Sequence, residues 1–151
     1  MRGRARLRAA GTEVLSRTLL VINAGSSSIK FSVFSVGPRD AHPVARYRGQ
    51  VDGLGARSRL VAVDTNGARM ADQAMDAGAT HDDALGGILN WIEARSTGET
   101  VVATGHRVVH GGVRYARPVR ITPGVLQELE ALVSLAPLHQ PHNTTWRLSS
   151  R

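Results

Sequence analysis

The sequence contains no cysteine, few aromatic residues and a single lysine among its 151 residues. Without cysteine there is no disulfide framework, no thiol nucleophile and no cysteine-ligated zinc site. No segment approaches the ~18 consecutive apolar residues that a membrane-spanning helix needs, so we expect no membrane partner. The length suffices for one domain with a core and is too short for two full domains. These absences are typical of a cytoplasmic globular protein, and we expect that localisation.

Positive charge is present but is concentrated at one end. The net charge is +7, and residues 1–17 contribute +4 of it through five arginines and Glu13. The remainder is too weakly basic to indicate a nucleic-acid partner, and we expect none. An arginine-rich, acid-poor start is one mark of a transit peptide. Because the segment has no continuous apolar stretch, we expect no secretory signal. We expect residues 1–17 to be a disordered extension or an over-long predicted start, with a transit peptide as the alternative.

A succession of short strands is predicted for the first half of the chain. Residues 19–22 are a continuous apolar run, which is typical of a strand covered on both faces. Asn66 followed by Gly67 is a strong signal for a two-residue β-hairpin turn. The expected strands cover residues 19–22, 29–36, 44–51, 59–64 and 68–73.

Two helices and one more strand are predicted for the second half. Thr80 and Asp83 form a capping-box pattern, a strand is expected over 101–109, and Thr122 before Pro123 is a typical helix start. The apolar stripes are Leu85, Ile88, Leu89 and Ile92 in the first helix, and Leu126, Leu129, Leu132 and Val133 in the second, which Pro137 ends. This order predicts an α/β fold, a mixed sheet of about five or six strands with helices packed on it.

The turn after the first strand is the first candidate site. Gly25 and the serines that follow it allow backbone N–H groups to approach an anion, and the hydroxyls add donors. If the chain is extended beyond the turn, Ser26, Ser28 and Lys30 share one face and converge on a phosphate. Asn23 can offer an amide oxygen to a hydrated Mg²⁺. The P-loop pattern is absent, and a serine-rich turn without a ligand is the alternative interpretation.

Arg107, within the strand predicted for residues 101–109, is the second candidate. A guanidinium buried in an apolar strand is costly unless it is paired. A small carboxylate substrate held by two parallel hydrogen bonds is one partner, and a structural Arg–Asp pair is the alternative. His106 and His110 have i, i+4 spacing, but the segment reads as a strand and no third ligand is evident. We therefore do not expect a metal site at these histidines.

A rigid loop over residues 136–143 is the third candidate. Two prolines, Pro137 and Pro141, restrict its backbone, and loops of this kind often line functional sites. By itself this loop indicates no particular chemistry.

Taken together, these three segments resemble the acetate kinase (acetokinase) family, part of the superfamily of acetate and sugar kinases, Hsp70 and actin. The matching stretches are LVINAGSSSIKF at 20–31, GHRVVHGG at 105–112, and ITP at 121–123 through APLH at 136–139. Order and spacing agree from about residue 19 to residue 143. The resemblance implies a ribonuclease-H-like domain and reversible transfer of the γ-phosphoryl group of ATP to acetate, giving acetyl phosphate and ADP.

The resemblance also implies roles for individual residues. The ATP-phosphate contacts of the family correspond to Lys30, Ser26 and Ser28 in this chain. Its Mg²⁺ residue corresponds to Asn23, and its substrate contact corresponds to Arg107. ATP is thereby implied as the co-substrate, Mg²⁺ as the cofactor, acetate or a similar short carboxylate as the substrate, and a homodimer as the state of the full-length family.

The resemblance departs from the family pattern near the C-terminal end. His139 corresponds to a histidine that forms an active-site wall, but Gln140 stands where the family commonly has Asn. After residue 143 the family continues with an apolar helix, whereas residues 144–151 are polar, so we expect three parts: 1–17, a domain over 18–143, and a tail. Family members are much longer, and their catalytic acidic residue and adenosine pocket lie beyond this end. We therefore assign no catalytic residue, and we expect no second domain and an inactive isolated chain.

Three alternatives to an acetate kinase fragment stay open. A propionate or butyrate kinase is one, since a single arginine and a loop do not determine acyl-chain size. A non-catalytic product of a truncated or frameshifted reading frame is another. A nucleic-acid-binding arm at residues 1–17 is the third.

Overall fold

The structure, a computed structural model, describes residues 17–37, 41–95, 100–108 and 114–131. Its strands are β1 (Arg17–Ala24), β2 (Ser28–Val36), β3 (Val44–Asp52), β4 (Arg59–Asp64), β5 (Arg69–Ala74) and β6 (Thr100–His106). Its helices are α1 (His81–Glu93) and α2 (Pro123–Glu130). The predicted mixed α/β sheet with two helices is confirmed. Residues 1–16 of the predicted extension lie outside the described residues, and its last residue begins β1.

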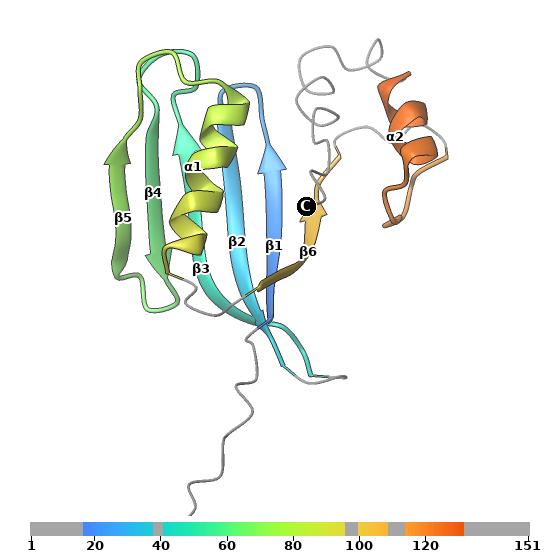
Figure 1. The fold of residues 1–151 in the computed structure, drawn as a ribbon, viewed down its shortest axis with the longest axis horizontal. Helices are drawn as coiled ribbons and strands as arrows, with labels where there is room; N and C mark the ends of the chain where they lie inside the picture. The colour runs from blue at the N-terminus through green and yellow to red at the C-terminus, as the bar shows by residue number, and fades with distance from the viewer. Residues whose placement is uncertain (1–16, 38–40, 96–99, 109–113, 132–151) are drawn as a thin grey trace, which may run out of the picture.

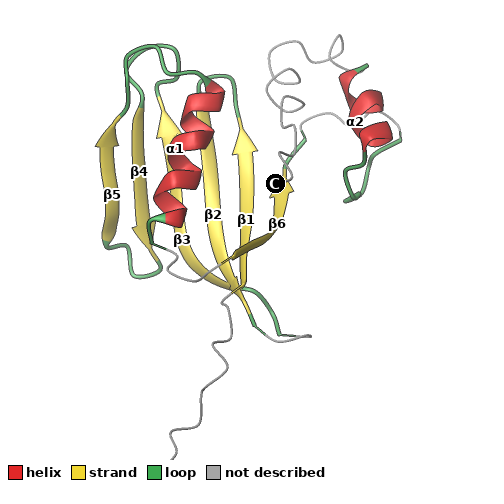
Figure 2. Cartoon of the chain, in the orientation of Figure 1, coloured by secondary structure: helices red, strands yellow, loops and turns green. Residues whose placement is uncertain are grey.

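The six strands form one sheet in the order β5-β4-β3-β2-β1-β6 (Figure 1). Strands β1 to β5 pair as consecutive antiparallel neighbours, whereas β6 pairs in parallel with β1. The parallel pair needs a crossover connection, and α1 lies within it. The β1–β2 turn and the β3–β4 loop lie at the same end of the sheet, because β1 to β4 alternate in direction. Helix α1 also begins at this end (Figure 2).

Helix α1 begins where the capping-box pattern predicts. Thr80 Oγ1 accepts a hydrogen bond from the Asp83 backbone N–H at 3.2 Å, and the Thr80 N–H donates to Asp83 Oδ2 at 2.9 Å. The bond from the Thr80 backbone holds the pKa of the Asp83 carboxyl below its ordinary value, because it stabilises the charged form. The buried residues of α1 are Ala84, Ile88, Trp91 and Ile92, while the predicted Leu85 and Leu89 are partly buried.

One face of the sheet packs against α1, and we call it the covered face. Alternate residues of the strands point to it. Its buried residues are Leu20, Ile22, Ala24, Ile29, Phe31, Val33, Val51, Leu60, Ala62 and Ala71. Burying each large apolar side chain contributes ~1.5–3 kcal/mol to folding, so this layer between sheet and helix is the main source of stability.

Gly49 on β3 makes room for an aromatic cluster on the covered face. A Cβ atom at Gly49 would lie 2.5 Å from Phe31 Cζ and 2.6 Å from the Val61 carbonyl oxygen. The Phe31 ring therefore lies against β3 where only glycine leaves space. The Trp91 ring meets Phe31 and Tyr47 edge-on, with centroids 5.8 Å and 5.4 Å apart. The cluster joins β2 and β3 to α1.

The opposite side of the sheet, which we call the open face, is not covered by either helix of the described chain (Figure 1). Its residues include Val21, Asn23, Ser28, Lys30, Ser32, Arg48, Gln50, Asp52, Arg59, Val61, Val63 and Asp72. Val21 is 38% exposed. The prediction that residues 19–22 are covered on both faces is therefore wrong for the described part of the chain, because α1 packs on one side only.

The turn between β4 and β5 is longer than predicted. The Gly67 N–H donates to the Asp64 carbonyl at 3.2 Å, so Thr65 and Asn66 are the central residues, and Gly67 follows with a φ of 83°. The Asp64 carboxylate also accepts from the N–H groups of Asn66 and Ala68. These local bonds favour a type of hairpin in which glycine takes the left-handed position after the turn. The predicted two-residue Asn-Gly turn is corrected accordingly.

Strand β6 ends at His106, and Arg107 and Val108 follow outside the strand. The prediction of a strand through residue 109 is therefore wrong at its C-terminal end, although its start is correct to within one residue. Ladder pairing with β1 stops at Ile22, which lies opposite His106. One backbone bond continues the contact, from the Arg107 N–H to the Ile22 carbonyl at 3.0 Å.

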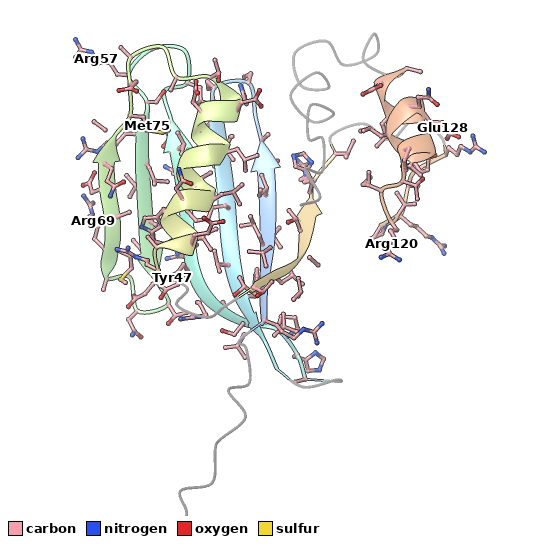
Figure 3. The ribbon with its side chains drawn as sticks, in the orientation of Figure 1. Tyr47, Arg57, Arg69, Met75, Arg120 and Glu128 are labelled. Carbon is pink, nitrogen blue, oxygen red and sulfur yellow. The ribbon has the colours of Figure 1, made fainter. Side chains whose placement is uncertain are left out.

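Helix α2 begins as predicted, with Pro123 in its first turn and the Thr122 hydroxyl accepting from the Val125 N–H at 3.3 Å. Leu129 is buried and Leu126 is partly buried, while Leu132 and Val133 lie outside the described residues. Glu128 (Figure 3) accepts a hydrogen bond from the hydroxyl of the tyrosine at 115, which ties that segment to the helix. Within the described ranges, neither helix has the length and apolar character needed to cross a membrane.

Candidate functional site

The β1–β2 turn forms a short, serine-containing tip. The Gly25 N–H donates to the Ser28 carbonyl oxygen at 2.8 Å and closes the turn. Ser26 and Ser27 are exposed residues of this bend, and Ser28 is the first residue of β2. The predicted alternation therefore applies to Ser28 and Lys30 but not to Ser26, because Ser26 lies in the turn rather than in an extended segment.

Strand register aligns polar residues in a row across the open face, next to this tip. Asn23 on β1 lies directly opposite Lys30 on β2, and Lys30 lies directly opposite Gln50 on β3. Residues in such positions have Cβ atoms ~4.5–5.5 Å apart. Lys30 is exposed and Asn23 is partly buried. The predicted magnesium residue and the predicted phosphate contact are thus neighbours on one surface.

Arg107 lies at the same end of the sheet as this row. Its backbone N–H bonds to the carbonyl of Ile22, the residue before Asn23. Because β6 runs parallel to β1, the C-terminal ends of both strands meet at one edge. The Arg107 side chain is exposed, which corrects the expectation of a buried guanidinium in a strand: pairing ends one residue earlier.

The two outer histidine candidates, His110 and His139, lie outside the described residues. His106 is partly buried at the end of β6, and burial lowers the pKa of its imidazole, so the neutral form is favoured at pH 7. In the part of the chain that the structure describes, no three His, Cys, Asp or Glu side chains are grouped so as to hold a metal ion.

A shallow depression of about 360 Å³ lies on the open face beside the polar row. Two cationic side chains, Lys30 and Arg48, line it together with Ser32 and Gln50, and Val61 and Val63 form its apolar side. The mixture of cations, hydroxyl and amide is suited to an anionic or polar ligand. The depression starts at Lys30 and extends away from β1, across β3 and β4.

Three polar residues near the tip were not found from the sequence. Gln50 Nε2 donates to Asp52 Oδ2 at 2.5 Å, and Asp52 lies directly opposite Ser28. His81, the first residue of α1, has its Nε2 atom 2.7 Å from the Gly25 carbonyl oxygen. Gln50 lies in the predicted strand 44–51, Asp52 directly follows that strand, and His81 lies between Thr80 and Asp83 of the predicted capping box. Neither of these sequence signals indicates a contact with the β1–β2 turn.

Comparison with known proteins gives one consistent family. Residues 18–146 match the acetokinase family. The acetate kinase of Rhizobium meliloti is 46% identical over 127 residues, which cover 83% of this chain and 32% of that protein. The acetate kinase of Rhodopseudomonas palustris is 40% identical over 131 residues, which cover 87% of this chain and 33% of that protein. The chain thus spans about a third of the length of the curated relatives it matches.

Solved structures give the same result at the level of the fold. The crystal structure of Porphyromonas gingivalis acetate kinase has a TM-score of 0.69 and 32% identity, with 84% of this chain and 32% of that chain covered. A propionate kinase from Francisella tularensis has a TM-score of 0.68 and 26% identity, with 85% and 32% covered. With the sequence match extending from β1 beyond α2, and the same fold in solved relatives, this chain belongs to the acetokinase family.

Proposed function

We propose that this chain forms the phosphate-binding and carboxylate-binding wall of an active site that transfers the γ-phosphoryl group of ATP to acetate. The observation that supports this most is the convergence of Asn23, Lys30 and Arg107 at one end of the sheet, beside the tip of the β1–β2 turn. Cations and backbone donors at one edge match what phosphoryl transfer requires, which is positioning and neutralisation of charge.

Each side chain has a distinct part in this proposal. The Lys30 ammonium contacts the phosphates of ATP, and the hydroxyls of Ser26 and Ser28 add hydrogen bonds at the tip. The exposed Arg107 guanidinium holds the acetate carboxylate by two parallel bonds, the geometry in which arginine binds carboxylates best. His139, which lies outside the described residues, is proposed as a further wall of the site.

Asn23 is proposed to hold the magnesium ion of the Mg·ATP complex. A single amide oxygen is a weak free-standing site, and the described residues hold no cluster of three ligands. Mg²⁺ usually keeps several waters and takes its remaining ligands from substrate phosphates, so one protein oxygen fits an ion that arrives with the nucleotide. When bound, the ion neutralises phosphate charge. Asn23 is suited to this contact because it lies directly opposite Lys30.

The chain by itself is proposed to be inactive. The family domain, expected from the sequence over residues 18–143, is proposed to reach at least residue 146, because the family match extends that far. Catalysis of phosphoryl transfer comes from groups on both sides of the transferring group. The wall described above supplies one side. We propose that the whole enzyme is located in the cytoplasm. We also propose that it forms a homodimer.

A chimera tests the proposal, with residues 17–143 replacing the matched segment of the Rhizobium meliloti enzyme. We expect acetyl phosphate formation, measured as the hydroxamate, at ordinary kinase rates of ~1–100 s⁻¹ in the chimera and none in the isolated chain. Lys30→Ala and Arg107→Ala should each lower turnover about a hundredfold. Arg69→Ala, at the outer edge of the sheet (Figure 3), is the matched control and should leave turnover unchanged. Full activity in both site variants would refute the assignment.

Propionate is the second candidate substrate, because the chain is also similar to the Francisella tularensis propionate kinase. One added methylene changes the transition-state binding energy of two competing substrates by only ~1–3 kcal/mol. Among the described residues of the site, none is assigned a contact with the acyl chain. Comparing kcat/KM for acetate, propionate and butyrate in the chimera decides between them. Acetate should have the highest value, and a higher value for propionate would favour the second candidate.

A further inference from the structure

His81 connects α1 to the tip of the β1–β2 turn. Its Nε2 atom lies 2.7 Å from the Gly25 carbonyl oxygen, although the two residues are 56 positions apart in the sequence. A carbonyl oxygen carries no hydrogen, so Nε2 is a protonated ring nitrogen and donates this bond. The bond is partly buried, whereas Ser26 and Ser27 at the tip are exposed. The contact thus links the proposed phosphate site to a helix of the core.

The His81 ring is carried by a well-anchored part of the fold. It is the first residue of α1, directly after the N-cap Thr80, and the capping box between Thr80 and Asp83 fixes this first turn. One and two turns further along, Ala84 and Ile88 are fully buried against the covered face. The position of the His81 side chain therefore follows from the same packing that forms the core.

A second contact holds the tip from the β3–β4 loop. The Leu54 N–H donates to the Ser27 carbonyl at 3.1 Å. The same loop is joined to the segment that precedes α1, because the Gly55 N–H donates to the Ala79 carbonyl at 3.0 Å. Two carbonyl groups of the tip, those of Gly25 and Ser27, are therefore both directed toward the protein.

The direction of these carbonyls determines the direction of two N–H groups. In a planar trans peptide the C=O and N–H bonds point in opposite directions, and the described peptide bonds include no cis bond. Holding the Gly25 carbonyl against His81 directs the Ser26 N–H away from α1. Holding the Ser27 carbonyl against Leu54 directs the Ser28 N–H away from the β3–β4 loop. The Ser26 N–H, at the exposed tip, is thereby left available to an anion, and backbone N–H groups of turns commonly bind phosphates.

We infer that His81 is a positioning residue for nucleotide binding: by holding the Gly25 carbonyl, it orients the Ser26 N–H toward the phosphates of ATP. This inference rests on the proposed function, in which the tip binds those phosphates. His81 touches no phosphate in this assignment, and its effect passes through the peptide between Gly25 and Ser26. Helix α1 thereby contributes to ligand affinity in addition to packing.

Calorimetric titration of the 151-residue chain with Mg·ATP tests the inference. His81→Phe keeps a ring but removes the donor, His81→Ala removes the donor without adding bulk, and His81→Gln restores an N–H near the Nε2 position. Each of the first two variants loses the net free-energy contribution of one hydrogen bond, so we expect them to weaken Mg·ATP binding about two- to tenfold. His81→Gln should recover most of the lost affinity. His42→Phe, at an exposed histidine before β3, is the matched control with unchanged affinity.

Backbone NMR of the same variants, without nucleotide, gives a second readout. The Ser26 amide resonance should shift in His81→Phe and His81→Ala and return toward its original position in His81→Gln, while resonances of β4 and β5 stay in place. An unmoved Ser26 resonance would overturn the inference. Weaker binding in Lys30→Ala but not in the donor-free His81 variants would overturn it while the proposed function stands. Unchanged binding in Lys30→Ala would refute the proposed function itself.

Discussion

The covered face and the open face are built from the same strands, yet they differ in almost every property. On β2, Ile29 is fully buried beneath α1, while its neighbour Lys30 is exposed on the other side. The covered face is apolar and close-packed, and the open face carries the polar row and the cationic depression. Strand alternation therefore separates stability from ligand chemistry at the level of adjacent residues.

The largest expected effect comes from changing this neighbouring pair. Ile29→Ala should lower the free energy of unfolding by ~2–5 kcal/mol, since it removes buried methylene groups and leaves a cavity. Lys30→Ala should change it by less than ~0.5 kcal/mol, as is usual for exposed positions. Urea denaturation of both variants measures the difference. Equal losses of stability in the two variants would mean that the faces are not energetically distinct.

Gly49 and Gly105 offer the next sharpest comparison, because both are strand glycines with different surroundings. A Cβ at Gly49 would lie 2.5 Å from Phe31 Cζ, whereas one at Gly105 would lie 3.8 Å from Val21 Cγ2, an ordinary contact. Gly49→Ala should cost ~1–3 kcal/mol through overpacking, and Gly105→Ala should be neutral or stabilising by up to ~1 kcal/mol. Thermal unfolding followed by circular dichroism ranks them. A stable Gly49→Ala variant would show that both the Phe31 ring and the backbone at Val61 can shift.

Thr80 tests how strongly the helix on the covered face depends on its cap. Thr80→Ala removes the acceptor for the Asp83 N–H and should lower the unfolding free energy by ~0.5–2 kcal/mol. Thr65→Ala, at an exposed turn position between β4 and β5, is the control and should be nearly neutral. Equilibrium denaturation at pH 7 provides the comparison. If both variants lose the same stability, the capping box contributes nothing particular to α1.

Asp72, at the outer edge of the open face, should give the smallest effect. Its carboxylate accepts from Arg59 Nε at 2.5 Å and also pairs with Arg69, and the hydrogen bond from Arg59 lowers the pKa of the Asp72 carboxyl below its ordinary value of 3.8. A carboxyl whose pKa is lowered by folding stabilises the folded state at pH values above its unfolded-state pKa of about 3.8. This stability is lost as the pH falls through the lower, folded-state pKa. Asp72→Asn should therefore be less stable than the unchanged chain at neutral pH. The loss should be small, because exposed ion pairs contribute little to stability.

Acid titration distinguishes that small effect from a structural one. The stability difference between Asp72→Asn and the unchanged chain should be constant near neutrality and should disappear below the folded-state pKa of Asp72, where the carboxylate is protonated in both folded and unfolded states. Added salt should reduce it as well, since exposed charges are screened. A difference that persists in acid would indicate that Asp72 acts through packing rather than charge.

Local signals predicted most of the fold. The capping box at Thr80 and the proline after Thr122 located both helix starts, and residues 29–36, 44–51 and 59–64 were predicted as strands almost to their ends. The two errors have different causes. Asp64 bonds to two N–H groups of its own turn and lengthens it, which is a local signal that the Asn-Gly interpretation did not take into account. Strand β6 stops where its pairing with β1 stops, and this depends on a distant strand and not on a propensity of the segment.

For the candidate site, too, part of the result could be predicted from the sequence and part depends on the tertiary structure. Short-range chemistry in the sequence identified the residues with donors and charge: Lys30 as the only lysine, the serines after Gly25, Asn23 and Arg107. Only the tertiary structure decided that Asn23 lies opposite Lys30, that Arg107 comes beside them after a crossover of many residues, and that His81 bonds to Gly25. Residue types and spacing are local properties, whereas register, crossover and helix packing bring distant segments together through burial of the apolar face.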